Sequence, residues 1–126
     1  MSPNTALKQY QTVNVQAQVL AADPHRLIQM LMEGGLTRLA QARGAIEHNQ
    51  IALKGEVIGK AIGIIGGLRE ALDHSKGSDI AVNLDRLYDY MIVQLSKANR
   101  TNDIKLVDEV AGLLRELKLG WDAIAP

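Results

Sequence analysis

Apolar residues recur every three or four positions along most of the chain, and this spacing predicts long α-helices. The most regular pattern covers residues 79–99. One arc of its helical wheel carries an almost unbroken apolar set: Ile80, Leu84, Leu87, Tyr88, Met91, Leu95 and Ala98. Charged residues such as Asp85, Arg86 and Lys97 fall elsewhere on the wheel, so this helix is expected to bury one face.

Three further helices are predicted from similar stripes and from residues that begin or end helices. Ala22-Asp23-Pro24 indicates the start of a helix. The Asp23 carboxylate can accept hydrogen bonds from the first backbone amides of the helix, and Pro24 suits the first helical position. These three helices cover residues 24–48, 53–74 and 103–124. Together with the helix over residues 79–99 they are separated by short polar turns. The core residues expected from the other stripes are Ile28, Leu31, Gly35, Leu39, Ala42, Ile46, Ile58, Ala61, Ile65, Leu68, Leu72, Val107, Val110, Leu114, Leu117 and Trp121.

Short turns between long helices force neighbouring helices to run antiparallel. The predicted fold is therefore all-α, an antiparallel up-down-up-down four-helix bundle over residues 23–126. Residues 1–22 are only weakly amphipathic, with Leu7, Tyr10 and Val13 among Gln, Asn and Thr. We expect this segment to be a mobile N-terminal arm or a short helix.

Composition narrows the functional classes. The 126 residues include 14 basic and 14 acidic ones, interleaved along the chain, which argues against the concentrated positive charge that binds nucleic acid. There is no cysteine, which excludes disulfides and agrees with a reducing compartment. No apolar run approaches the roughly 18 residues of a membrane span, and the N-terminus does not resemble an export signal. We therefore expect a cytoplasmic protein that does not insert into membranes.

The three histidines do not form a site. In the predicted bundle His25 and His74 share one end and His48 lies at the other, and none belongs to an inward Glu-x-x-His pair. We interpret all three as surface residues and expect no metal, no cofactor and no catalysis. A histidine phosphotransfer domain is an alternative for a four-helix bundle. Its histidine would need a Lys and a Gly one turn later, whereas Lys54-Gly55 follows His48 across a helix break.

Glycines interrupt the second predicted helix, although each costs roughly 1 kcal/mol relative to Ala in a helix interior. Gly59 and Gly63 cluster with Gly55, Gly66 and Gly67 on the side opposite the core stripe. A face of small residues lets another backbone come close, which indicates a docking track for a foreign helix. Relaxed selection at exposed positions, or fraying near Gly55, explains the glycines equally well.

Apolar residues beside the core stripes indicate grooves for a partner. Ile62 flanks the stripe of the second predicted helix, and Leu106 and Leu113 flank that of the fourth. Tyr90 lies outside the central arc of the third, whereas Tyr88 is expected at the margin of the core. An amphipathic or disordered segment can fold into such grooves. A fully packed core with an extra covering element is the alternative.

Four stretches of sequence, in a fixed order, form a specific combination. They are Pro24-His-Arg-Leu-Ile-Gln-Met-Leu31, Lys-Ala-Ile-Gly-Ile-Ile-Gly-Gly-Leu at 60–68, Asn-Leu-Asp-Arg-Leu-Tyr-Asp-Tyr at 83–90 with Leu95 and Ala98-Asn99, and the lone Trp121. Together they resemble the FliS family of flagellar export chaperones for flagellin, over nearly the whole chain. Two positions depart from the family pattern: Met32 stands where a Tyr is usual, and Ala22-Asp23-Pro24 replaces the commoner Ser-Pro.

The resemblance implies an ATP-independent binding protein and no enzyme activity. Its client would be the disordered C-terminal segment of flagellin, held in the bacterial cytoplasm, kept from premature polymerisation and delivered to the cytosolic domain of the flagellar type III export gate. Leu7 and Tyr10 match a family element implicated in covering the client groove and in docking to the gate. A structural adaptor of the secretion apparatus is a further alternative.

The residues expected to bind partners come from both the pattern and the resemblance. They are Leu7, Tyr10, Gly59, Ile62, Gly63, Tyr90, Leu106 and Leu113. We expect the free protein to be a monomer or a weak homodimer through its exposed grooves.

Overall fold

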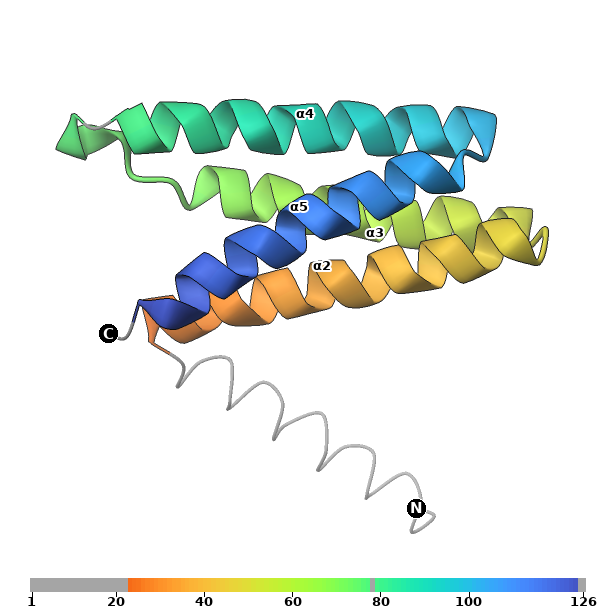
Figure 1. Cartoon of the computed structure of the whole chain (residues 1–126), viewed down its shortest axis with the longest axis horizontal. Helices are drawn as coiled ribbons and strands as arrows, with labels where there is room; N and C mark the ends of the chain where they lie inside the picture. The colour runs from red at the N-terminus through yellow and green to blue at the C-terminus, as the bar shows by residue number, and fades with distance from the viewer. Residues whose placement is uncertain (1–22, 78, 125–126) are drawn as a thin grey trace, which may run out of the picture.

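The computed structural model describes residues 23–77 and 79–124, which form four long helices. In chain order these are α2 (Pro24–Glu47), α3 (Ile51–Glu70), α4 (Asp79–Thr101) and α5 (Ile104–Ala123), with the short 3-10 helix η1 (His74–Lys76) between α3 and α4. Both α2 and α4 pack against α3 and α5, and successive helices run in opposite directions (Figure 1). The predicted all-α antiparallel bundle is confirmed.

Polar side chains begin the helices largely where the sequence indicated. The amide of Arg26 donates to the Asp23 carboxylate at 2.7 Å, and Pro24 occupies the first turn of α2. At the start of α5 the amide of Lys105 donates to Asp103 at 2.9 Å. These bonds satisfy amides that have no partner within the helix.

The predicted end of the second helix was wrong. Helix α3 ends at Glu70 and not at residue 74. The Asp73 carboxylate accepts from the Ser75 amide at 2.9 Å and begins η1, and Gly77 then takes a left-handed conformation with φ of +63°. A short acidic side chain that bonds nearby amides competes with helix continuation, which explains the earlier end.

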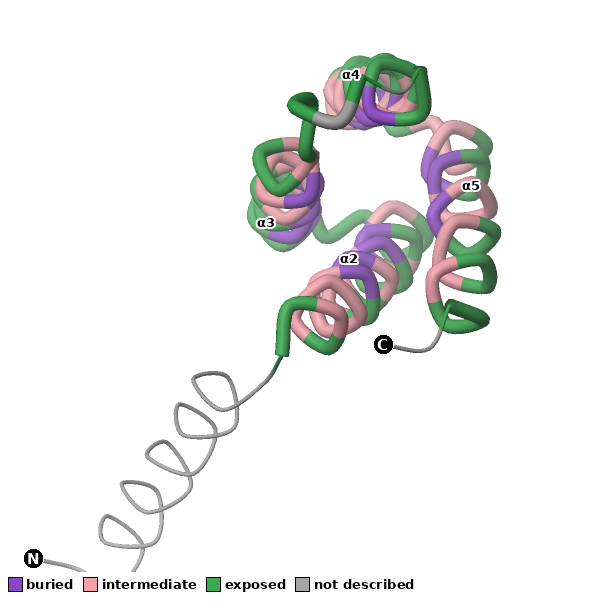
Figure 2. The backbone as a smooth tube through the Cα atoms, turned by 90° about the vertical axis from the view of Figure 1, so that its left-hand side faces the viewer, coloured by how far each residue is buried: buried purple, intermediate pink, exposed green. Residues whose placement is uncertain are grey.

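The core lies where the predicted stripes meet. Figure 2 shows the buried segments of all four helices on the sides that face a common centre. The largest fully buried side chains are Leu39, Ile58, Ile65, Met91, Leu95, Val107, Val110 and Leu114. Each belongs to a stripe predicted from the sequence, so the periodicity identified the centre of the core correctly.

Two positions on α4 differ from expectation. Ile80 was expected in the core but is 68% exposed, because it lies in the first turn of α4, where the neighbouring helices leave it uncovered. Tyr88 was expected at the margin of the core but is only 3% exposed, and burial raises the pKa of its hydroxyl. Both residues line the cavity described below.

A buried lysine, which the apolar pattern did not reveal, connects α3 to the turn between α4 and α5. Lys54 is 7% exposed, and its Nζ donates to the Asn99 carbonyl at 2.8 Å and to Asn102 Oδ1 at 2.5 Å. The C-terminal end of a helix favours positive charge, so the end of α4 is a favourable place for this ammonium group. Lys54 therefore ties this end of the bundle together.

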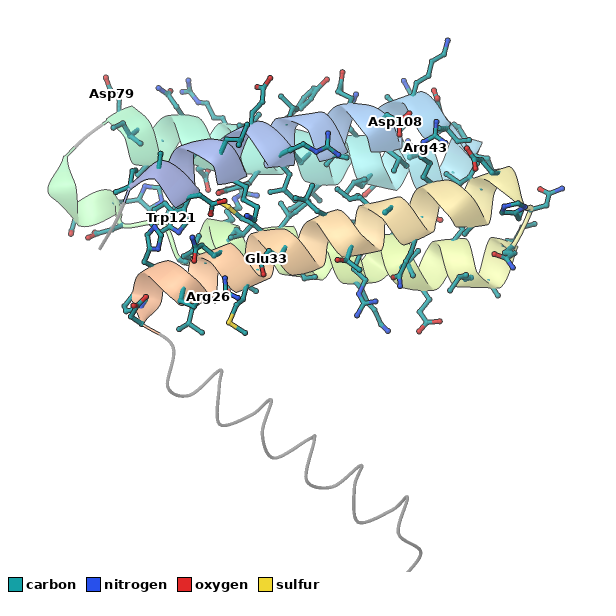
Figure 3. All side chains as sticks on the ribbon, turned by 60° about the horizontal axis from the view of Figure 1, so that its bottom comes forward. Arg26, Glu33, Arg43, Asp79, Asp108 and Trp121 are labelled. Atoms are coloured by element: carbon teal, nitrogen blue, oxygen red, sulfur yellow. The ribbon has the colours of Figure 1, made fainter. Side chains whose placement is uncertain are left out.

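Two arginines join neighbouring helices at the surface. Arg69 of α3 donates to both carboxylate oxygens of Asp85 on α4, at 2.6 and 3.2 Å, and these hydrogen bonds hold the pKa of Asp85 below its usual value. Arg43 of α2 bonds Asp108 of α5 at 3.0 Å, and Figure 3 shows this pair between the two helices. Exposed pairs of this kind contribute modestly to stability, so they mainly favour this arrangement of the helices.

The start of α2 and the end of α5 are joined by a reciprocal pair of hydrogen bonds. His25 Nε2 donates to the Trp121 carbonyl at 2.8 Å, and Trp121 Nε1 donates to the His25 carbonyl at 3.0 Å. The two rings stack with centroids 4.8 Å apart. The expectation that all three histidines are surface residues was therefore wrong for His25, which is half-buried, whereas His48 and His74 are exposed.

Leu114 of α5 packs closely against α2 at Gly35. A methyl group at Gly35 would lie 2.9 Å from Leu114 Cδ2 and 3.5 Å from Ile64 Cγ2. Leu114 is fully buried, so its side chain has little room to move away. The absence of a side chain at Gly35 is what allows α5 to cross α2 at this distance.

Gly35→Ala is expected to lower the free energy of unfolding in urea by about 1 kcal/mol, because overpacking of about 1–3 kcal/mol outweighs a gain of about 1 kcal/mol in helix propensity. Gly63→Ala is the matched control, since a methyl group there meets no atom within 4 Å. It should stabilise by about 0.5–1 kcal/mol. Equal stabilisation by both substitutions would contradict the close approach of α5 to α2.

His25→Ala should lower the free energy of unfolding by about 1–2 kcal/mol, because it removes one hydrogen bond and the stacking on Trp121. His48→Ala, at the exposed C-cap of α2, should change it by less than about 0.5 kcal/mol. Urea titration followed by the fluorescence of the single tryptophan measures both. Equal effects of the two substitutions would show that the His25–Trp121 contact contributes nothing.

Candidate functional site

An apolar cavity of about 370 Å³ opens at the end of the bundle where α2 begins and α5 ends. All four helices and the connection after α3 contribute to it. The lining residues are Ile28, Met32, Leu68, Ala71, Leu72, Ile80, Leu84, Tyr88, Glu116, Leu117, Gly120, Trp121 and Ile124. Almost all of them are apolar, and Glu116 is the single charged residue among them.

The course of α5 explains why the cavity is here. Figure 1 shows α5 starting beside the end of α4 and running towards the start of α2, where the His25–Trp121 contact holds it. Towards the start of α4, α5 has therefore moved away from that helix. The lining includes Ala71, which has only a methyl group, and Gly120, which has no side chain. Neither residue fills the space that this divergence leaves.

A second apolar cavity of about 440 Å³ adjoins the first. It is lined by Pro24, His25, Leu27, Ile28, Leu31, Ala71 and Trp121. Ile28, Ala71 and Trp121 line both cavities, so the two belong to one apolar surface at this end of the bundle.

The rim of the first cavity is unusually apolar for a surface. Ile80 is 68% exposed and Ile124 is 60% exposed, and both line the cavity. Contiguous exposed apolar surface beside a concave site is typical of a surface that binds another molecule. The residues that form it suit the apolar side chains of a protein segment.

The lining of the first cavity offers no group suited to catalysis. It contains no histidine, serine or lysine, and its only carboxylate belongs to Glu116. Across residues 23–77 and 79–124, no three His, Asp or Glu side chains come together in a way that would hold a metal ion. Among these residues, no helix is long and apolar enough to cross a membrane. The arrangement is therefore suited to binding by burial of apolar surface.

The glycine face of α3 lies where the sequence placed it. Gly59 and Gly63 are exposed on the outer side of the helix, and methyl groups at either position would meet no atom within 4 Å. The orientation is confirmed, but the structure shows no partner on this face. Its role as a docking track stays a prediction.

The flanking apolar residues are half-buried. Ile62, Leu106 and Leu113 pack against the core cluster and do not stand free on the surface. Tyr90 is 42% exposed, and its hydroxyl donates to Glu109 Oε1 of α5 at 2.6 Å, a bond that raises the pKa of Tyr90. Tyr90 therefore bridges α4 and α5 in the free protein.

The structure does not gather the predicted partner-binding residues into one site. Of those within the described residues, none lines either cavity, and Leu7 and Tyr10 lie outside the described residues. Many of the cavity residues, such as Ile28, Leu84 and Trp121, had been assigned to the core because they lie on the apolar stripes. The available signal was the pairing of large stripe residues with Ala71 and Gly120 near the helix ends.

Comparison with known proteins identifies the family. The model of the family described as "Flagellar protein FliS" matches residues 6–126. The flagellar secretion chaperone FliSB of Pseudomonas aeruginosa is 65% identical over 120 residues, which cover 95% of each chain. The flagellar secretion chaperone FliS of Vibrio cholerae is 46% identical over 121 residues, which cover 96% of this chain and 89% of the relative.

A solved structure supports the fold. The "Crystal structure of flagellar chaperone from bacteria" has a TM-score of 0.74, with 17% sequence identity, and the match covers 90% of this chain and 95% of that one. At this identity the likeness concerns the fold alone. The family match instead removes the histidine phosphotransfer alternative, because a secretion chaperone is a binding protein and not an enzyme. With residues 6–126 matched and close relatives along almost its full length, the chain belongs to the FliS family of flagellar secretion chaperones.

Proposed function

We propose that this protein binds the disordered C-terminal segment of flagellin in the bacterial cytoplasm, without ATP and as a one-to-one complex. Binding keeps flagellin from polymerising prematurely and delivers it to the cytosolic domain of the flagellar export gate. The observation that carries this proposal is the apolar cavity with its exposed rim at one end of the bundle. Membership of the FliS family supports it.

The physical basis is burial of apolar surface. A segment that assembles into a filament carries an apolar face, which must be covered until assembly begins. The cavity and its rim, with Ile80 and Ile124, offer an apolar surface without any reactive group. Burying such surface contributes about 25 cal/mol per Å², reduced by the cost of ordering the client. Reversible binding of a disordered segment suits a protein that must release its client.

Other surfaces extend the contact along the bundle. A client long enough to leave the cavity can continue along the glycine face at Gly59 and Gly63, or beside Tyr90. Ile62, Leu106 and Leu113 then contribute at the margin of the core. We assign these residues to client binding on their exposure or position, as a second region beyond the cavity.

In this proposal residues 1–22 act as a second functional unit, in addition to the bundle of residues 23–126. In this proposal Leu7 and Tyr10 cover the client surface when it is empty and contact the export gate after the client binds. The segment joins the bundle at Pro24, which lines the second cavity. A covalently attached competitor acts at high effective concentration, so weak contacts are sufficient. The free protein is a monomer or a weak homodimer.

Calorimetry with a peptide of the C-terminal segment of flagellin from the same bacterium tests client binding. We expect binding with a negative change in heat capacity, because apolar surface is buried. Ile80→Asp should weaken binding by roughly tenfold or more without unfolding the protein, since Ile80 is exposed at the cavity rim. Ile51→Asp is the matched control, because Ile51 is 66% exposed in the first turn of α3 and lines neither cavity.

No heat at peptide concentrations on the order of tens of micromolar would reject client binding. Equal losses for Ile80→Asp and Ile51→Asp would reject the cavity as the binding site.

Tyr10→Ala tests the proposed delivery of the client to the export gate. We expect the client-loaded variant to bind the isolated cytosolic domain of the export gate more weakly, while the urea midpoint of the bundle stays unchanged. Thr12→Ala, in the same segment, is the control. A cooperative loss of the whole fold in Tyr10→Ala would show instead that Tyr10 belongs to the core.

A further inference from the structure

Glu116 is distinctive among the residues of the cavity. It is the single charged residue of the lining, and it is exposed on α5. Within the described residues, its carboxylate has no hydrogen bond or ion pair. A charge at the edge of an apolar surface, with no partner among residues 23–77 and 79–124, is available to a ligand.

Two other carboxylates on α5 and α2, those of Asp122 and Glu33, have cationic partners. Asp122 accepts from Lys118 at 2.6 Å, and this hydrogen bond lowers the pKa of Asp122. Glu33 accepts from Arg26 at 3.1 Å, and Figure 3 labels this pair on α2. Lys118 and Arg26 are therefore paired with carboxylates other than that of Glu116.

Arg115, the cation next to Glu116 in sequence, forms no ion pair with it either. Arg115 is adjacent to Glu116, and neighbouring positions on a helix point in different directions. Glu116 also has Gly112 and Gly120 at the two positions four residues away, where a helical ion-pair partner would stand. The local sequence therefore leaves this carboxylate open towards whatever occupies the cavity.

We propose that Glu116 is a specificity determinant for the client: the occupant of the cavity is an amphipathic helix with a Lys or Arg beside its apolar stripe, and that cation pairs with Glu116. This inference rests on the proposed function, because the helix is assigned to the C-terminal segment of flagellin. The apolar lining accepts the stripe, and Glu116 fixes the rotation of the helix about its axis. Charge complementarity at a rim contributes more to orientation and selectivity than to total affinity.

The test is calorimetry of the full chain with the flagellin C-terminal peptide, at about 50 mM and about 300 mM salt. Glu116→Gln should weaken binding about two- to fivefold at low salt, and Glu116→Lys by roughly tenfold, with smaller effects at high salt. Glu47→Gln is the control, because Glu47 is an exposed glutamate at the opposite end of the bundle and lines neither cavity. It should leave the affinity unchanged.

A second peptide, in which each Lys and Arg is replaced by Gln, completes a double-mutant cycle. This peptide should bind wild type and Glu116→Gln equally well. Binding of the natural peptide that is the same for wild type, Glu116→Gln and Glu47→Gln would overturn the role of Glu116 while leaving the proposed function intact. Absence of binding to wild type would overturn both.

One further outcome concerns this chain's own N-terminal segment. Residues 1–22 carry a single charged side chain, Lys8. Tighter client binding by Glu116→Lys, reproduced by Lys8→Gln, would mean that Glu116 holds Lys8 and not the client. That result would overturn the proposal.

Discussion

The close packing of α5 onto α2 determines the shape of the rest of the bundle. It depends on the missing side chain at Gly35, which admits Leu114, and on the paired hydrogen bonds between His25 and Trp121. At the other end, Lys54 ties α3 to the turn between α4 and α5. A helix held to α4 at its start and to α2 at its end must cross between them, and this crossing leaves one end of the bundle open.

We propose that the client binds at this open end of the bundle. The crossing separates residues that would otherwise complete the core, so Ile80 stays exposed at the rim of a cavity and Trp121, which packs on His25, lines the cavity with its remaining surface. An apolar surface of this kind is costly to leave in water, and the free energy regained when a client covers it drives binding. Under the proposed function the protein needs no catalytic group, because its task is to cover an apolar face reversibly. Specificity would then depend on the shape of the cavity and on Glu116, the single charged residue of its lining.

Much of the fold could be predicted from the sequence because its determinants are local. The positions of Leu39, Ile65 and Met91 in the core follow from a period of 3.6 residues, and the cap at Asp23 follows from adjacent residues. The exposure of Ile80 could not be predicted in this way, because the crossing of α5 decides it. The outward orientation of the glycine face was predicted correctly, whereas its use requires knowledge of the partner. Sequence patterns therefore identified the core well and the cavity poorly.

Hydrogen–deuterium exchange of the full chain, with and without the C-terminal segment of flagellin, tests client binding at the open end most directly. The client should slow exchange in the first turns of α4 and the last turns of α5, which line the cavity. The outer face of α3 should change less. Protection confined to residues 55–67, or no protection despite saturating client, would contradict binding at the cavity.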